Sequence, residues 1–114
     1  MTDRDRLFRG HILSAIDDIA EFTADGRSEF FAERKTQSAV IRPLEIIGEA
    51  VKQLSPALTS AEPAVPWRAI AGTRDRLIHG YFTVDIDAVW SMIEGDLPAL
   101  RAEVSRIAAG RCSG

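Results

Sequence analysis

The sequence predicts an all-α fold, an antiparallel bundle of four to five helices. Apolar residues recur at steps of three and four along most of the chain, which is the spacing of one helix face. No stretch of useful length alternates between apolar and polar residues as a strand would. The 114 residues are 46% apolar but only 7% aromatic, which suits an aliphatic helical core. We therefore expect one helical domain over residues 1–110 and a flexible C-terminal tail over residues 111–114.

The first helix is expected over residues 3–24. Thr2 or Asp3 stands where such a helix would begin, and Asp25 followed by Gly26 marks its end. The residues that share its apolar face are Phe8, Ile12, Ala15, Ile19 and Phe22.

A second, long helix is expected from near Ser28 or Thr36 to about residue 54. Pro43 lies inside it. Because proline lacks a backbone donor and clashes with the preceding turn, we expect a kink or a break around residues 39–42. Residues 55–66 are rich in proline, serine, threonine and alanine, and we expect the only long loop there. The apolar face of this helix consists of Val40, Leu44, Ile47, Val51 and Leu54.

A third helix is expected between two strong end signals. Pro66 suits its first position, and Gly80 suits the residue just after its C-terminus. Its apolar side consists of Trp67, Ile70, Leu77 and Ile78.

A fourth helix is expected to begin after Thr83 or Asp85, either of which can cap its N-terminus. Its apolar stripe continues to residue 107. Gly95 and Pro98 should bend this helix without ending its pattern.

Composition and charge exclude several classes of protein. The net charge of −3 argues against a protein that coats nucleic acid, so any such contact must be a local basic site or one built by two chains. The single cysteine, Cys112, allows neither an internal disulfide nor a cysteine metal cluster, which favours a reducing, cytoplasmic setting. No uninterrupted apolar run exceeds three residues, so we expect no membrane span. No phosphate-binding loop or zinc spacing is present, and we expect no metal and no cofactor.

The residues with the clearest chemistry lie near the end of the third helix. Arg74 and His79 are roughly 140° apart on an ideal helix, so they converge only if the helix ends here. Asp75 precedes His79 by four residues and can hold one imidazole nitrogen. Gly80 releases the chain from the helix, which lets Tyr81 return beside the histidine.

These residue types fit metal-free cleavage of a phosphodiester. Histidine moves protons near neutral pH, and arginine is a permanent forked donor to phosphate oxygens. A ribose 2′-hydroxyl would attack the adjacent phosphorus, with His79 moving the proton and Arg74 stabilising charge on the phosphoryl oxygens. One chain supplies one such histidine, whereas a symmetric dimer would supply an acid and a base.

A structural interpretation stays open beside this one. A histidine in the last turn of a helix interacts favourably with the helix dipole and often does nothing else. Arg74 would then be a surface charge and Tyr81 a half-buried core residue. Spacing alone does not decide between the two interpretations.

The order Arg-x4-His-x-Tyr, present as Arg74, His79 and Tyr81, resembles the signature of the HEPN superfamily, and specifically of its DUF86 or HepT-like toxins. The resemblance covers nearly the whole chain. Further matching stretches are LEIIGEAVKQL at 44–54, the lead-in at 67–72, HGYFTVD at 79–85, Val89-Trp90 and Leu97-Pro98.

This resemblance implies an all-helical homodimer in which Arg74 and His79 of both subunits line a cleft and act as the catalytic residues of a metal-independent endoribonuclease. Asp75 stands where relatives often carry asparagine. It keeps the orienting hydrogen bond but adds negative charge near the RNA. The resemblance also implies a cognate MntA-like nucleotidyltransferase antitoxin, which would silence the toxin by transferring AMP to Tyr81.

A second function remains open: a non-catalytic helical dimer that binds the nucleotidyltransferase and helps to present nucleotide or substrate to it. Other candidate residues favour structural roles. We expect His11 at the surface or an interface. Glu45 and Glu49 are spaced to bind a metal or to face an arginine across the bundle, and we favour the structural ion pair with an arginine. Trp67 and Trp90 are expected in the core or at a dimer interface rather than stacked on bases.

Overall fold

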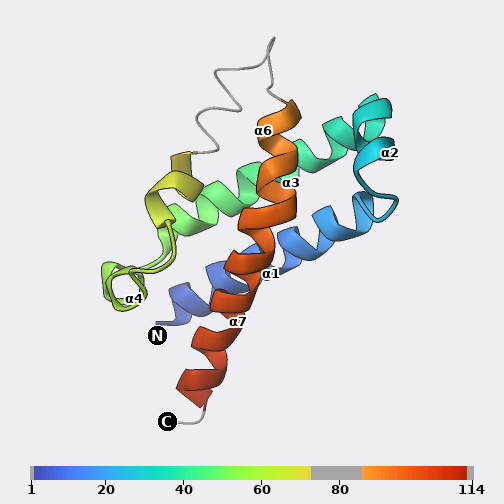
Figure 1. The fold of residues 1–114 in the computed structure, drawn as a ribbon. Coiled ribbons are helices and arrows are strands. Elements are labelled where there is room, and N and C mark those ends of the chain that lie inside the picture. Colours follow the sequence, from blue (N-terminus) through green and yellow to red (C-terminus); the bar gives the residue numbers. More distant parts are fainter. Residues whose placement is uncertain (1, 73–85, 113–114) are drawn as a thin grey trace.

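The structure is a computed structural model that describes residues 2–72 and 86–112. This part of the chain is entirely helical and contains no strand, as the sequence predicts. The first elements are α1 (Asp3–Phe22), α2 (Arg27–Ala32), α3 (Arg34–Gln53) and α4 (Pro56–Ala61). Residues 67–72 are helical, and the chain continues as α6 (Ile86–Ser91), the π-helix η1 (Met92–Asp96) and α7 (Leu97–Cys112) (Figure 1). None of the described helices is long and apolar enough to cross a membrane.

The frame of the fold is the antiparallel pair α1 and α3, with α7 crossing over it (Figure 1). The core lies between these three helices, and burying each of its large aliphatic side chains stabilises the fold by about 1.5–3 kcal/mol. Its fully buried members include Ile12, Ile19, Leu44, Ile47, Leu97 and Leu100.

Polar contacts also hold α7 across α1. The guanidinium of Arg101 makes two hydrogen bonds to the carboxylate of Asp17, Nε to Oδ1 at 2.8 Å and Nη2 to Oδ2 at 3.3 Å. The Nε of Arg9 donates to the carbonyl of Val104 at 3.2 Å. Hydrogen bonding to Arg101 lowers the pKa of Asp17, so this pair remains charged at neutral pH.

Of the kink or break expected around residues 39–42, the break is wrong, because α3 runs unbroken through Pro43. The proline is buried beside Val40 and Leu44, and this apolar burial offsets the lost backbone hydrogen bond. The chain breaks instead at Glu33, whose backbone is extended with φ −114° and ψ 107°. Here the side-chain amide of Gln37 donates to the carbonyls of residues 30 and 31 at 3.0 and 3.2 Å, which covers the end of α2.

The long loop expected over residues 55–66 is also wrong, since α4 occupies half of it. Ser55 caps this helix by accepting a hydrogen bond from the backbone N–H of Leu58 at 3.3 Å, and Pro56 takes the first helical position. The side chain of Leu58 is buried in the core, which stabilises a helix too short to form alone.

The later helices follow the predicted pattern where the structure describes them. A helix begins at Trp67, directly after Pro66. The fourth expected helix stays helical past Gly95, but its turns widen into η1, where the N–H of Leu97 donates to the carbonyl of Met92. Pro98 has no N–H for the regular pattern, which favours such a π-turn just before it.

The buried carboxylate of Asp5 joins the start of α1 to the start of α4. It is only 1% exposed. Its oxygens accept hydrogen bonds from the backbone N–H and the hydroxyl of Ser55, both at 2.8 Å, and from the backbone N–H of Thr2 at 3.3 Å. Burial alone raises the pKa of Asp5, but these hydrogen bonds outweigh it and leave the pKa below its ordinary value.

We expect Asp5→Asn to lower the free energy of unfolding by about 1–3 kcal/mol at pH 7, because an amide nitrogen cannot accept the bonds that Oδ2 accepts. Since the folded-state pKa is lowered, this contribution is complete above the ordinary value of 3.8 and is lost as the pH falls through the folded-state value. Urea unfolding at pH 7 and under acid conditions measures both effects. Asp3→Asn is the control, because the Asp3 side chain is 99% exposed. Equal losses in the two variants would contradict the role of Asp5.

Candidate functional site

The four residues of the predicted site, Arg74, Asp75, His79 and Tyr81, lie outside the described residues. Their roles therefore stay predictions. What the structure does describe is the frame on either side of them: residues 67–72 lead into this segment, and α6 leads out of it.

The lead-in helix is fixed at its first residue. The indole Nε1 of Trp67 donates to the backbone carbonyl of Glu62 at 3.0 Å. The same carbonyl accepts from the backbone N–H of Val65 at 3.3 Å, so it closes the turn between α4 and the helix. Val65 and Ile70 are buried on either side of Trp67 and anchor this part of the chain to the core.

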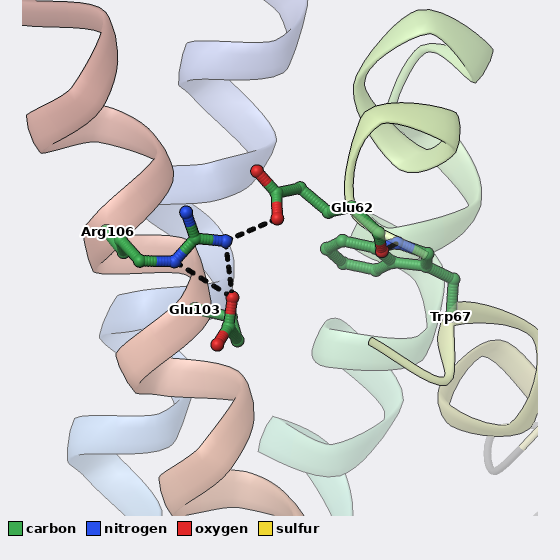
Figure 2. A network of polar contacts seen from close by, with 4 residues as sticks. All are labelled: Glu62, Trp67, Glu103 and Arg106. Atoms are coloured by element: carbon green, nitrogen blue, oxygen red, sulfur yellow. Dashed lines mark hydrogen bonds and ion pairs between the residues drawn. The ribbon is translucent and has the colours of Figure 1, made fainter. Parts of the chain in front are cut away.

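The side chain of Glu62 continues this network to α7 (Figure 2). Its carboxylate accepts a hydrogen bond from Nη2 of Arg106, which also donates to Glu103 of its own helix at 2.6 Å. The Nε of Arg106 makes a second bond to Glu103 at 3.1 Å. Hydrogen bonding to Glu103 and then to Glu62 raises the pKa of Arg106.

The lead-out helix α6 is fixed by aromatic packing. The ring of Trp90 lies 5.1 Å from the ring of Phe30 and 6.4 Å from that of Phe31, measured between centroids. The guanidinium of Arg27 lies 4.7 Å from the centroid of Phe31, close enough for a cation–π contact. The two tryptophans pack partly buried against the core, as predicted.

A groove of about 530 Å³ runs between α1 and α3. His11 lies exposed in it, with its ring edge-to-face on Phe8 at 5.3 Å, which confirms the expected surface position. Glu45 makes its ion pair with Arg42 of the same helix, at 3.4 Å, rather than across the bundle. The groove is lined by Phe8, His11, Ser14, Ala15, Asp18, Arg42, Glu45, Ile46, Glu49 and Ala50.

Within residues 2–72 and 86–112, no cluster of three or more histidine, cysteine or acidic side chains is arranged to hold a metal ion. The Glu62–Arg106 contact and the Asp5–Ser55 contact were both missed by the sequence analysis. The only local signals were Thr2 three residues before Asp5, and Glu103 three residues before Arg106.

Comparison with known proteins adds the identity of the family. The model of the family described as "Ribonuclease HepT-like" matches residues 12–107. The chain is 43% identical over 97 residues to "Probable ribonuclease HepT" of Thermococcus cleftensis, an alignment that covers 84% of this chain and 88% of the relative. It is 42% identical over 103 residues to "Putative RNase MJ0127" of Methanocaldococcus jannaschii, covering 90% and 85%. No solved structure matches it.

The family match spans most of the chain, from within α1 to within α7, and includes the segment with the predicted site. It agrees with the resemblance to the HEPN superfamily found in the order of the motifs. The chain therefore belongs to the HepT-like ribonuclease family.

Proposed function

We propose that this protein is a metal-independent endoribonuclease toxin, silenced by a cognate MntA-like nucleotidyltransferase that transfers AMP to Tyr81. One observation carries the proposal: the order Arg74, His79, Tyr81 stands within a chain that belongs to the HepT-like ribonuclease family. The two relatives compared are both named as ribonucleases, which supports RNA as the substrate.

The proposed reaction needs only side chains and the substrate's own nucleophile. His79 removes the proton of a ribose 2′-hydroxyl, whose oxygen attacks the adjacent phosphorus. The bond to the 5′-oxygen breaks, and a second histidine gives that oxygen a proton. Arg74 stabilises the extra negative charge on the phosphoryl oxygens, and Asp75 orients His79. The products are a 2′,3′-cyclic phosphate and a 5′-hydroxyl.

A second copy of the chain can supply that second histidine, because each chain carries one histidine in the motif. We assign the groove between α1 and α3 as the surface where the copies meet. In the described part of the chain α7 covers the opposite face of this helix pair, whereas no described helix covers the groove. The apolar side chains of Ala15, Ile46 and Ala50 line it.

The charged side chains of the groove are placed so that a two-fold axis would bring opposite charges of the two copies together. Asp5 bonds to Ser55 across the antiparallel pair, and in this register Ser14 at the middle of α1 lies opposite Ile46 on α3. Arg42 and Glu49 stand about one turn on either side of that level, and both line the groove. A two-fold axis crossing at that level brings Arg42 of each copy against Glu49 of the partner subunit.

The same two-fold axis would also pair residues of α1 between the two copies. His11 and Asp18 also line the groove, and they stand about one turn to either side of Ser14. The axis that pairs the α3 charges therefore places His11 of one copy near Asp18 of the partner subunit. One pair of opposite charge, Arg42 with Glu49, and one pair of hydrogen-bonding groups, His11 with Asp18, would share one centre, which supports self-association through this surface.

The function is tested by cleavage of a mixed RNA by the purified dimer in the presence of EDTA, before and after incubation with ATP and the nucleotidyltransferase. We expect cleavage that leaves 2′,3′-cyclic phosphate ends, and its loss once AMP is on Tyr81, because the adenylate adds bulk and negative charge at the site. Tyr81→Phe should cleave RNA but escape the silencing.

Cleavage that requires added metal would contradict the proposed chemistry. An unmodified, folded dimer that leaves RNA intact while binding its nucleotidyltransferase would instead identify the chain as the non-catalytic binding module.

A further inference from the structure

We propose that Arg106 and Glu62 are positioning residues for the segment that carries the site: through Trp67 they fix the direction in which the helix at 67–72 leaves the bundle. This inference rests on the proposed function, because it assigns those residues an effect on the same site. It differs from that function in concerning only side chains that the structure describes.

The first step is the geometry of Glu62. Its backbone carbonyl accepts hydrogen bonds from the backbone N–H of Val65 and from the indole of Trp67, while its carboxylate accepts one from Arg106. One residue thereby connects the turn after α4, the first residue of the lead-in helix and α7 (Figure 2).

The second step is that Arg106 is held in place before it meets Glu62. Glu103, one turn earlier on α7, takes hydrogen bonds from both Nε and Nη2 of its guanidinium. A side chain fixed in this way loses little conformational freedom when it binds a further carboxylate. The ion pair between Arg106 and Glu62 therefore fixes the direction of the helix at 67–72, in addition to adding an attractive contact.

The third step separates positioning from stability. The Arg106 side chain is 58% exposed, and ion pairs at such positions contribute little to the stability of a fold. The buried side chains of Leu97, Leu100 and Val104 already attach α7 to the core. Loss of the Arg106 contact should therefore leave the bundle folded, with Val65 and Ile70 still buried, while weakening the hydrogen bond between Trp67 and the Glu62 carbonyl.

The fourth step is the displacement that a small tilt at Trp67 causes at the far end of the helix. Gly72, the last described residue of this helix, follows Trp67 by five residues, which corresponds to about 7.5 Å along a helix. A tilt of about 10° at Trp67 would displace this end of the helix by roughly 1.3 Å, and a displacement of about 1 Å can lower a rate by about 10²-fold. A small tilt of the helix at Trp67 is thus enough to lower the rate of RNA cleavage.

The test compares Arg106→Gln with Arg101→Gln. Both arginines are exposed, lie on α7 and pair with an acidic side chain of another element, but Arg101 pairs with Asp17 of α1, away from the lead-in helix. We expect kcat for RNA cleavage to fall about tenfold or more in Arg106→Gln with KM little changed, no such fall in Arg101→Gln, and similar melting temperatures. Arg106→Lys, which keeps the charge, should recover part of kcat.

A double-mutant cycle with Glu62→Gln sharpens the result. Glu62→Gln keeps the backbone carbonyl that binds Trp67 and removes only the charge that binds Arg106. If the two side chains act as one contact, the double variant loses no more activity than either single variant. Additive losses, or equal losses in Arg101→Gln, would overturn the proposal.

A second measurement does not depend on RNA cleavage. With Trp90→Phe, Trp67 is the only tryptophan, and exchange of its indole proton with solvent reports directly on the bond to Glu62. We expect faster exchange in Arg106→Gln than in Arg101→Gln. If the parent protein cleaves no RNA, the proposed function fails, and the exchange rates alone decide this inference: equal rates refute it.

Discussion

His79→Ala is expected to lower kcat/KM for RNA cleavage by about 10²–10⁴-fold, the usual effect of removing a positioned proton-transfer group. Arg74→Ala should lower kcat/KM by a similar factor, because the arginine is proposed to stabilise charge that develops on the phosphoryl oxygens. Both losses should appear mainly in kcat, since these interactions strengthen in the transition state. Initial rates with a labelled RNA in EDTA measure them.

Arg68→Ala is the matched control for Arg74→Ala. Arg68 is an exposed arginine of the helix at 67–72, six residues before Arg74 in the sequence, and it has no role in the proposed chemistry. Its variant should cleave at close to the wild-type rate. The dimer state of each variant is checked at the assay concentration, so that a loss of activity is not a loss of the partner copy. A rate for His79→Ala within about threefold of wild type would remove this residue from the mechanism.

The helices could be predicted where the apolar pattern and the end signals are local. The first helix was expected over residues 3–24 and occupies Asp3–Phe22. The helix after Pro66 begins at Trp67, and the last apolar stripe remains helical through Pro98. In each case the periodicity identifies the face that the core buries, which is the property that decides helix formation.

The two errors of fold prediction have one physical cause. The penalty for Pro43 is local and visible in the sequence, whereas its burial depends on how α3 packs into the fold. In the same way, residues 55–66 look like a loop from their composition, but Leu58 reaches the core and stabilises α4. Tertiary contacts decided both cases, and no local pattern reports them.

The candidate site likewise contains residues that the sequence could indicate and residues that it could not. Arg74, Asp75 and His79 could be selected from spacing and from the resemblance, because the residues of the motif are close together in the sequence. The contact between Glu62 and Arg106 joins positions 44 residues apart, so spacing could not suggest it. The contact between Asp5 and Ser55 spans 50 residues. Only the structure reveals residues that act through distant partners.

Arg42→Glu is expected to raise the dimer dissociation constant by at least about tenfold, because like charges facing each other across an interface cost several kcal/mol. The proposed two-fold axis would repeat the pair, so each dimer would carry the unfavourable contact with Glu49 twice. RNA cleavage should fall in parallel at low protein concentration and recover at high concentration, because the proposed site needs both copies. Sedimentation equilibrium and cleavage rates over the same concentrations measure the two effects.

Adding Glu49→Arg to Arg42→Glu should restore both dimerisation and cleavage, because the reversed charges again face their opposites. Arg34→Glu makes the same change of charge at an exposed position of α3 outside the groove, and it should dimerise as wild type does. A double reversal that stays monomeric would show that the copies meet elsewhere. Arg42→Glu that is monomeric and still cleaves at the wild-type rate would instead refute the shared site, because a single chain would then hold all the groups that the reaction needs.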